Sequence, residues 1–123
     1  SEFAGTKPLN AAFRRRMSVW INFSYLSIGN QISPEEIKLI QKRSGVDEDT
    51  ATRIVRAGAE LRRQYQMGDL PYGPSPGDLM NWAILIADGS DPLEAAEESI
   101  VGTTSDDVEI QEAVRRIIKR FFS

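Results

Sequence analysis

One segment of this chain has the alternation of apolar and polar side chains that is typical of a β-strand, and it precedes only helical patterns. In the segment from Val19 to Tyr25, the apolar residues Val19, Ile21 and Phe23 alternate with their neighbours. No second segment alternates over four or more residues, so a strand here would leave its backbone N–H and C=O groups unpaired. The sequence therefore predicts a fragment of a larger α/β protein, whose exposed strand would recruit another chain by dimerisation or domain swapping.

The composition excludes several classes of chemistry. The 123 residues suffice for one domain with a core, and the net charge of −3 argues against a dedicated nucleic-acid binder. The chain has no cysteine and no histidine, which excludes disulfides, His- or Cys-based zinc sites and His-dependent catalytic triads. It has no apolar run long enough to span a membrane and no apolar core of a signal peptide, so we expect a cytoplasmic protein without membrane partners.

Three helix starts share one pattern, in which a capping residue precedes a proline and an acid follows at the third helical position. They are Ser33-Pro34-Glu35-Glu36, Ser75-Pro76-Gly77-Asp78 and Asp91-Pro92-Leu93-Glu94. The apolar periodicity then predicts five helices, with Gly89 ending the third. The expected helices are Pro34–Ser44, Glu48–Met67, Pro76–Asp88, Pro92–Val101 and Asp106–Phe122. A short helix over Pro8–Arg16 precedes the strand Val19–Phe23.

Two motifs have both a structural and a functional interpretation. Arg14-Arg15-Arg16 is either a solvated helix end or a set of guanidinium groups that reach a phosphate or carboxylate on a partner. Ser75 to Asp78 is by itself a capping box, and Asp78 occupies the positive potential that an anion would otherwise use. The acids around Glu94–Glu98 and Asp106–Glu109 lack the spacing of a metal site, so we expect a solvated acidic surface and no metal. Trp20 and Trp82 are expected in the core.

Taken together, these segments resemble a known family. The runs G-T-K-P-L-N-A-A-F-R-R-R-M, V-W-I-N-F-S-Y-L, S-P-E-E-I-K-L-I-Q-K-R-S-G-V-D, P-S-P-G-D-L-M-N-W-A-I-L-I and D-P-L-E-A-A are similar to the C-terminal part of MoxR-type AAA+ ATPases. Within that group the chain resembles the branch of NorQ, NirQ, CbbQ and the gas-vesicle protein GvpN. The similarity extends from about Gly5 to Phe122.

The resemblance implies a fold and an activity. Residues 1–27 would be the tail of the ATPase core, with the short helix and the last strand, and residues 28–123 a mostly α helical lid. The parent would form a ring of AAA+ subunits that uses ATP and magnesium to remodel or activate a client protein, acting as a chaperone, with a von Willebrand A-type companion in some cases. The chain has no phosphate loop, so the fragment is expected to hold no cofactor and to be inactive alone.

The resemblance also implies roles for particular residues. Arg16, with Arg14 one helical step away, matches the finger that reaches a neighbouring subunit's ATP, although Met17 replaces the usual Phe. The turn of Ser75, Gly77 and Asp78 would lie near the nucleotide, but Gly77 stands where the family usually has the sensor 2 Arg.

The competing hypothesis for the whole chain is a free-standing all-α interaction domain or a DNA-binding helical bundle.

Overall fold

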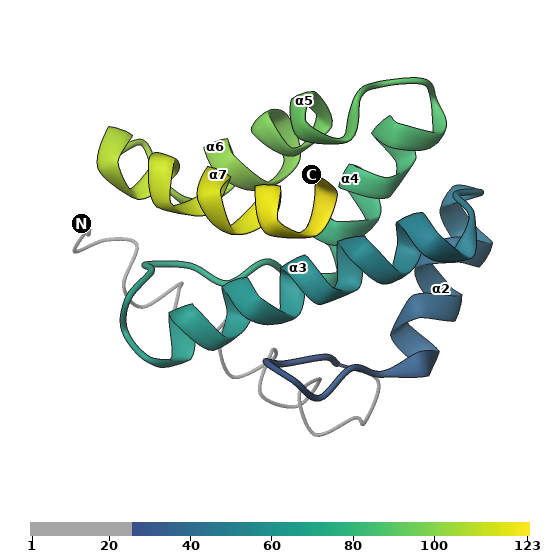
Figure 1. Cartoon of the computed structure of the whole chain (residues 1–123), viewed down its shortest axis with the longest axis horizontal. Coiled ribbons are helices and arrows are strands. Elements are labelled where there is room, and N and C mark those ends of the chain that lie inside the picture. Colours follow the sequence, from purple (N-terminus) through teal and green to yellow (C-terminus); the bar gives the residue numbers. More distant parts are fainter. Residues whose placement is uncertain (1–25) are drawn as a thin grey trace, which may run out of the picture.

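The described part of the chain is built from helices joined by short connections (Figure 1). The structure is a computed structural model that describes residues 26–123, and no sheet is present among them. Its elements are α2 (Pro34–Ser44), α3 (Glu48–Gln66), α4 (Pro76–Ala87), α5 (Pro92–Ala96), the π-helical turn η1 (Glu97–Val101), α6 (Gly102–Thr104) and α7 (Val108–Phe122). The mostly α class is confirmed. The predicted helix Pro8–Arg16 and strand Val19–Phe23 lie outside the described residues.

The three proline-led helix starts are confirmed. The side chains of Ser33, Ser75 and Asp91 each accept a backbone N–H from the first turn of the helix that follows. Gly89 has a φ of 113°, in the left-handed region that glycine adopts without steric cost. It follows the last turn of α4 and donates its N–H to the carbonyl of Ile86, so it ends that helix as predicted.

The helix predicted over Pro92–Val101 differs from the structure in its second half, which forms the π-helical turn η1. The physical reason lies in the spacing of two buried pairs, Ala95-Ala96 and Ile100-Val101. Residues five apart on an α-helix diverge by about 140° around the axis. A wider turn with i→i+5 hydrogen bonds brings both pairs to the same side, so both pairs are buried.

The last helix begins later than predicted. The sequence pattern predicts a start at Asp106, whereas α7 begins at Val108 and Asp107 is its cap. The Asp107 carboxylate accepts the N–H groups of Glu109 and Ile110. An aspartate at this position stabilises a helix more as a cap than inside the first turn, because it satisfies donors that have no partner within the helix.

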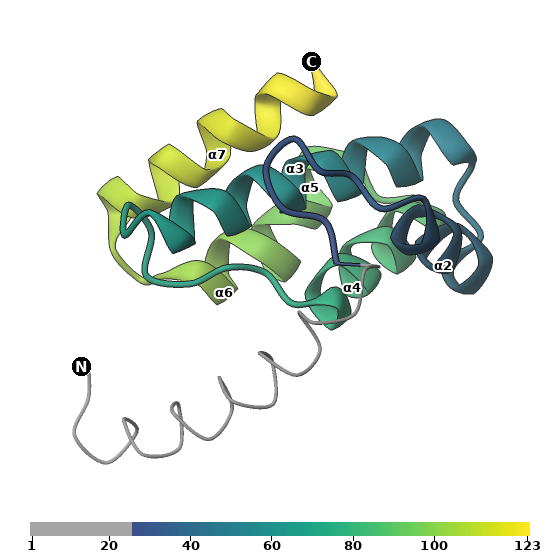
Figure 2. The ribbon, with the colours of Figure 1, turned by 90° about the horizontal axis from the view of Figure 1, so that it is seen from below.

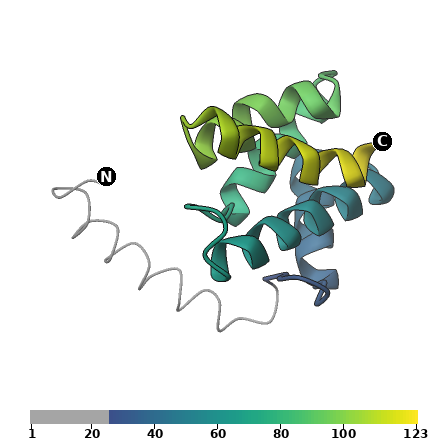
Figure 3. The same cartoon turned by 60° about the vertical axis from the view of Figure 1, so that its left-hand side comes forward.

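Helix α3 lies at the centre of the fold and packs against α2, α4 and α7. Figure 3 shows α7 between α3 on one side and the α5–η1–α6 run on the other. The apolar faces of the helices form one core, which includes Ile54, Val55, Leu61, Leu79, Trp82, Ile100, Val114 and Ile118. Trp82 is fully buried as expected, donates its Nε1–H to the carbonyl of Pro92 at 2.9 Å, and has its ring 5.3 Å from that of Phe122. Trp20 lies outside the described residues.

Two connections lie against α3 and bring distant segments together. The turn at Ile28–Gln31 crosses α3, where Gly29 donates its N–H to the carbonyl of Ala59 (Figure 2). The loop between α3 and α4 folds back on α3. Two observations show this: Leu70 is only 5% exposed, and a Cβ at Gly73 would lie 3.2 Å from the Cβ of Tyr65.

Candidate functional site

The predicted site residues fall into two groups, of which the structure describes one. Ser75, Gly77 and Asp78 lie together where the loop after α3 becomes helix α4. Arg14 and Arg16 lie outside the described residues, so their proposed role stays a prediction. The geometry of the site is therefore that of the α4 turn and the side chains behind it.

The α4 turn is closed by its own side chains. Ser75 Oγ accepts the Asp78 N–H at 3.1 Å, and Asp78 Oδ2 accepts the Ser75 N–H at 2.9 Å, so the predicted capping box is confirmed. The same carboxylate oxygen accepts the hydroxyl of Tyr72 at 2.5 Å. Burial, together with this neighbouring carboxylate, raises the pKa of Tyr72 well above its usual range. The Asp78 carboxylate thus occupies the positive end of α4, where an external anion would have to displace it.

Gly77 occupies an exposed position in the first turn of α4. A Cβ built there would meet only Ser75 Oγ, at 3.6 Å, which is ordinary van der Waals contact. Packing in this domain therefore does not require glycine at position 77, and a long side chain has space to project from the turn.

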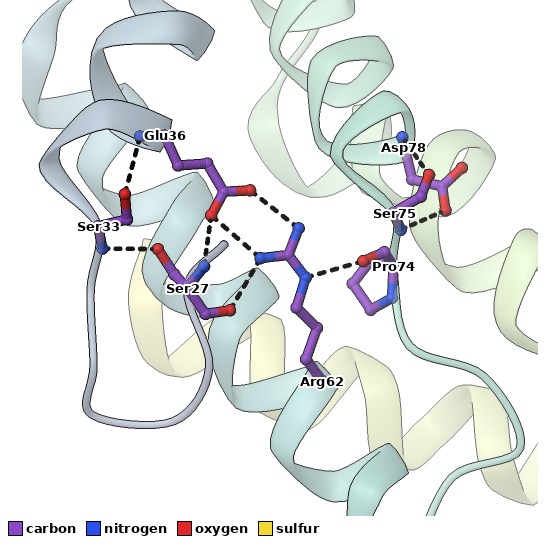
Figure 4. Close-up of polar contacts among 7 residues, drawn as sticks. All are labelled: Ser27, Ser33, Glu36, Arg62, Pro74, Ser75 and Asp78. Atoms are coloured by element: carbon purple, nitrogen blue, oxygen red, sulfur yellow. Dashed lines mark hydrogen bonds and ion pairs between the residues drawn. The ribbon is translucent and has the colours of Figure 1, made fainter. Parts of the chain in front are cut away.

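A buried ion pair lies directly behind this turn (Figure 4). Arg62 of α3 is 5% exposed and Glu36 of α2 is fully buried. Arg62 Nη2 donates to Glu36 Oε2 at 2.9 Å, and Nη1 donates to Oε1 at 3.1 Å. Such a bidentate pair is among the stronger polar contacts in proteins, because both partners are charged and their planar geometries match.

The remaining hydrogen bonds of the pair go to backbone groups of two other segments. Arg62 Nε donates to the Pro74 carbonyl at 2.9 Å, and Nη1 donates to the Ser27 carbonyl at 2.8 Å. Glu36 Oε1 accepts the Ser27 N–H at 2.8 Å, and Ser27 Oγ accepts the Ser33 N–H at 2.8 Å. Among the described residues, no buried side-chain N or O atom lacks a partner. We call Ser27, Ser33, Glu36, Arg62 and Pro74 the Arg62 network.

Sequence reasoning did not identify this network. Glu36 is the acid of the first proline-led helix start, but its carboxylate faces the interior and does not complete a capping box. The available signal was the position of Arg62, seven residues after Val55 and four after Gly58, which places a charged residue on the apolar face of α3. Its partner could not be identified in the same way, because Glu36 comes from a different helix.

One acid of the predicted acidic surface, Glu97, has an ion-pair partner. Glu97 forms a two-point ion pair with Arg115, with distances of 2.6 and 2.8 Å, and Arg115 also contacts Glu112 at 3.3 Å. The Arg115 guanidinium holds the pKa of Glu97 below its ordinary value. Across residues 26–123, no three acidic side chains converge in a way that would hold a metal ion.

The comparison with protein families decides what kind of domain this is. The model of the CbbQ/NirQ/NorQ C-terminal family matches residues 36–121, which cover α2 through most of α7. The chain belongs to the CbbQ/NirQ/NorQ C-terminal family. Domains of this family form the C-terminal part of MoxR-type AAA+ proteins. A comparison with curated proteins gives no match.

The part of the chain that matches the CbbQ/NirQ/NorQ C-terminal family contains the α4 turn and three residues of the Arg62 network. The matched residues include Glu36, Arg62 and Pro74, whereas Ser27 and Ser33 come before the match begins. Within residues 26–123, none of the helices combines the length and the apolar character needed to cross a bilayer.

Proposed function

We propose that this chain is the C-terminal lid region of an ATP-driven MoxR-type protein that remodels or activates a partner protein. The observation that carries the proposal is the family match over residues 36–121. The proposed parent assembles as a ring of identical subunits in the cytoplasm and acts on a client protein, in some cases with a von Willebrand A-type companion. The client is bound and remodelled by the ring, and the lid region transmits nucleotide-dependent movement.

Two observations argue against direct ATP binding at the α4 turn. The Asp78 carboxylate closes the N-terminal end of α4, and the buried Arg62 guanidinium already donates to Ser27, Glu36 and Pro74. Arg63 is paired with Glu60. A polyphosphate at the α4 turn would therefore meet the Asp78 carboxylate, while Arg62 and Arg63 already pair with other carboxylates. We assign ATP and magnesium binding to the parent protein outside residues 26–123.

A catalytic contribution from this chain is proposed for the segment before the described residues. There Arg16, with Arg14 in a lesser role, would reach the nucleotide of the neighbouring subunit. An arginine suits this task because its guanidinium is permanently charged and donates two parallel hydrogen bonds. Arg15, about 100° further round a helix, is the matched control.

The test measures ATP turnover of the full-length parent with single Arg14→Ala, Arg15→Ala and Arg16→Ala substitutions. We expect Arg16→Ala to lower kcat on the order of 10³-fold with little change in ATP binding, Arg14→Ala to lower it less, and Arg15→Ala to be nearly silent. Equal effects at positions 15 and 16 would refute the finger assignment. A parent gene without a phosphate-loop motif upstream would refute the proposed function as a whole.

A further inference from the structure

The Arg62 network has an unusual arrangement, because an ion pair buried between two helices holds the backbone of two connections. Ser27 comes from the segment that leads into the domain, and Pro74 immediately precedes the α4 turn. These residues are 47 positions apart in the sequence. Figure 4 shows both carbonyl groups directed at the same guanidinium. Arg62 is therefore the one side chain of the network that contacts both connections.

The hydrogen bonds around Ser27 leave little freedom for this segment. Its carbonyl accepts from Arg62, its N–H donates to Glu36, and its Oγ accepts from Ser33. All three polar groups of the residue are used, and Ser27 is fully buried. A buried hydrogen bond to a charged group is costly to break unless water replaces it. We therefore expect the segment at Ser27 to move with α2 and α3.

The chemistry of the pair argues for a positioning role. Burying a guanidinium and a carboxylate has a large desolvation cost, and an apolar pair of similar volume often stabilises a fold equally well. An apolar pair would lack the donors that reach the Ser27 and Pro74 carbonyls. The distinguishing property of Arg62 and Glu36 is thus the fixed alignment of two connections, which apolar packing alone does not provide.

We propose that Arg62 is a positioning residue that joins the segment at Ser27 to the α4 turn, so that a displacement of one is transmitted to the other. The proposal rests on the proposed function, in which the ATPase core precedes residue 28. In that protein, Arg62 would convert a movement at the core–lid connection into a movement of the α4 turn, which the resemblance places near the nucleotide. The resemblance implies that Gly77 stands where the family has the sensor 2 arginine, so this mechanical link would take the place of a direct phosphate contact from that position.

The first experiment uses this chain and follows amide hydrogen exchange by NMR. The double substitution Glu36→Met/Arg62→Met replaces the ion pair by apolar side chains of similar length. We expect the amides of Ser27 and Ser75 to lose protection together, by roughly ten-fold or more in exchange rate, while core amides of α3 keep theirs. Unchanged protection at Ser75 would overturn the proposal, because the two segments would then be independent.

A matched control is available on the surface of the same domain. Glu97 and Arg115 also form a two-point pair, here through Nε and Nη2 of the arginine, but their side chains are 47% and 36% exposed. Glu97→Met/Arg115→Met is expected to leave exchange at Ser27 and Ser75 unchanged. If the control has the same effect as the buried pair, the loss of protection reflects general destabilisation and the proposal is wrong.

The second experiment measures steady-state ATP turnover of the full-length parent. For Glu36→Met/Arg62→Met we expect kcat to fall about ten-fold with KM for ATP changed less than about two-fold, since coupling is lost while nucleotide binding is not. Arg62→Lys keeps the positive charge but lacks the planar guanidinium that donates two parallel hydrogen bonds, and should give an intermediate kcat. A wild-type kcat in a variant whose Ser27 and Ser75 amides exchange rapidly would overturn the coupling role.

The experiments distinguish a failure of the proposed function from a failure of the coupling role of Arg62. A wild-type parent that does not hydrolyse ATP would refute the proposed function, and hydrogen exchange in this chain would still decide whether Arg62 couples the two segments. Conversely, an active parent whose kcat does not respond to the loss of the Arg62 network would leave the proposed function intact and refute only the coupling.

Discussion

Gly58 of α3 lies directly beneath Leu79 of α4, so close that a Cβ at position 58 would lie 2.7 and 2.8 Å from the two Leu79 methyl groups. Both residues are fully buried in the core. The absence of a side chain at position 58 is therefore what allows α4 to cross α3 at this point.

We expect Gly58→Ala to destabilise the domain although alanine favours helix formation. The gain in helix propensity is about 1 kcal/mol, whereas overpacking of a filled core costs about 1–3 kcal/mol. Chemical denaturation should show a net loss of stability. Gly77→Ala is the control and should be neutral or slightly stabilising, because a Cβ there makes only an ordinary van der Waals contact with Ser75 Oγ. A Gly58→Ala variant more stable than the wild type would contradict the packing observed here.

Removing one partner of the buried ion pair should be far more damaging than removing both. Arg62→Ala leaves the Glu36 carboxylate buried without its counter-ion and is expected to cost about 3–5 kcal/mol. Glu36→Met/Arg62→Met leaves no unpaired charge and should cost clearly less. Urea denaturation of the three proteins separates the cases, and equal losses for the single and double variants would argue against a paired role.

Tyr72 offers a prediction about alkaline pH. Its pKa is raised in the folded state above the ordinary value of 10.0, so its contribution to stability is present below pH 10 and is lost as the pH rises through the folded pKa. Tyr72→Phe removes the hydrogen bond to Asp78 and should cost about 1–2 kcal/mol at neutral pH. The difference in unfolding free energy between wild type and variant should shrink above pH 10. A difference that grows with pH in this range would contradict the assignment.

The ion pair of Glu97 predicts how the stability of the domain changes at acidic pH. The pKa of Glu97 is lowered below its ordinary value of 4.5 by Arg115, so its contribution is present above pH 4.5 and is lost as the pH falls through the folded pKa. Because the pair is exposed, Glu97→Gln should cost only about 0–1 kcal/mol at pH 7. Thermal unfolding curves of the two proteins should converge at lower pH. If the difference in unfolding temperature between the two proteins stays constant down to pH 2, the ion pair is not the cause of that difference.

Gly77→Arg should be tolerated by the fold. The position is exposed and open, so the substitution is expected to change stability by no more than about 1 kcal/mol, with the loss of glycine flexibility offsetting an unfavourable charge at a helix N-terminus. In the full-length parent, an arginine here should tighten ATP binding if the turn faces the nucleotide. Calorimetric titration measures this, with Gly77→Gln as the uncharged control. Equal affinities for both variants would place the turn away from the phosphates.

The helices could be predicted from the sequence because their signals are local. Ser33, Ser75 and Asp91 stand directly before prolines, and the caps they form depend on neighbours within three residues. The π-helical turn could not be predicted in the same way. It exists because Ala95-Ala96 and Ile100-Val101 must face one core, and that requirement comes from α4 and α7.

In the candidate site, too, the local contacts could be predicted from the sequence and the contacts between distant segments could not. The capping box of Ser75 and Asp78 follows from the spacing of two residues, and the structure confirms it. The pairing of Arg62 with Glu36 depends on how α2 crosses α3, which no local pattern specifies. The second hydrogen bond to the Asp78 carboxylate, donated by the Tyr72 hydroxyl, depends on how the loop folds back on α3.

The hydrogen bonds of Ser27 also determine where the chain can be cut. The sequence predicts a domain border between residues 27 and 28, yet a shorter protein beginning at Ile28 would remove one donor and two acceptors from the Arg62 network. Glu36 and Arg62 would then be paired only with each other and with Pro74, or with water entering the gap. Any excised or fused version of this domain should therefore begin no later than Leu26, so that the peptide groups on both sides of Ser27 are present.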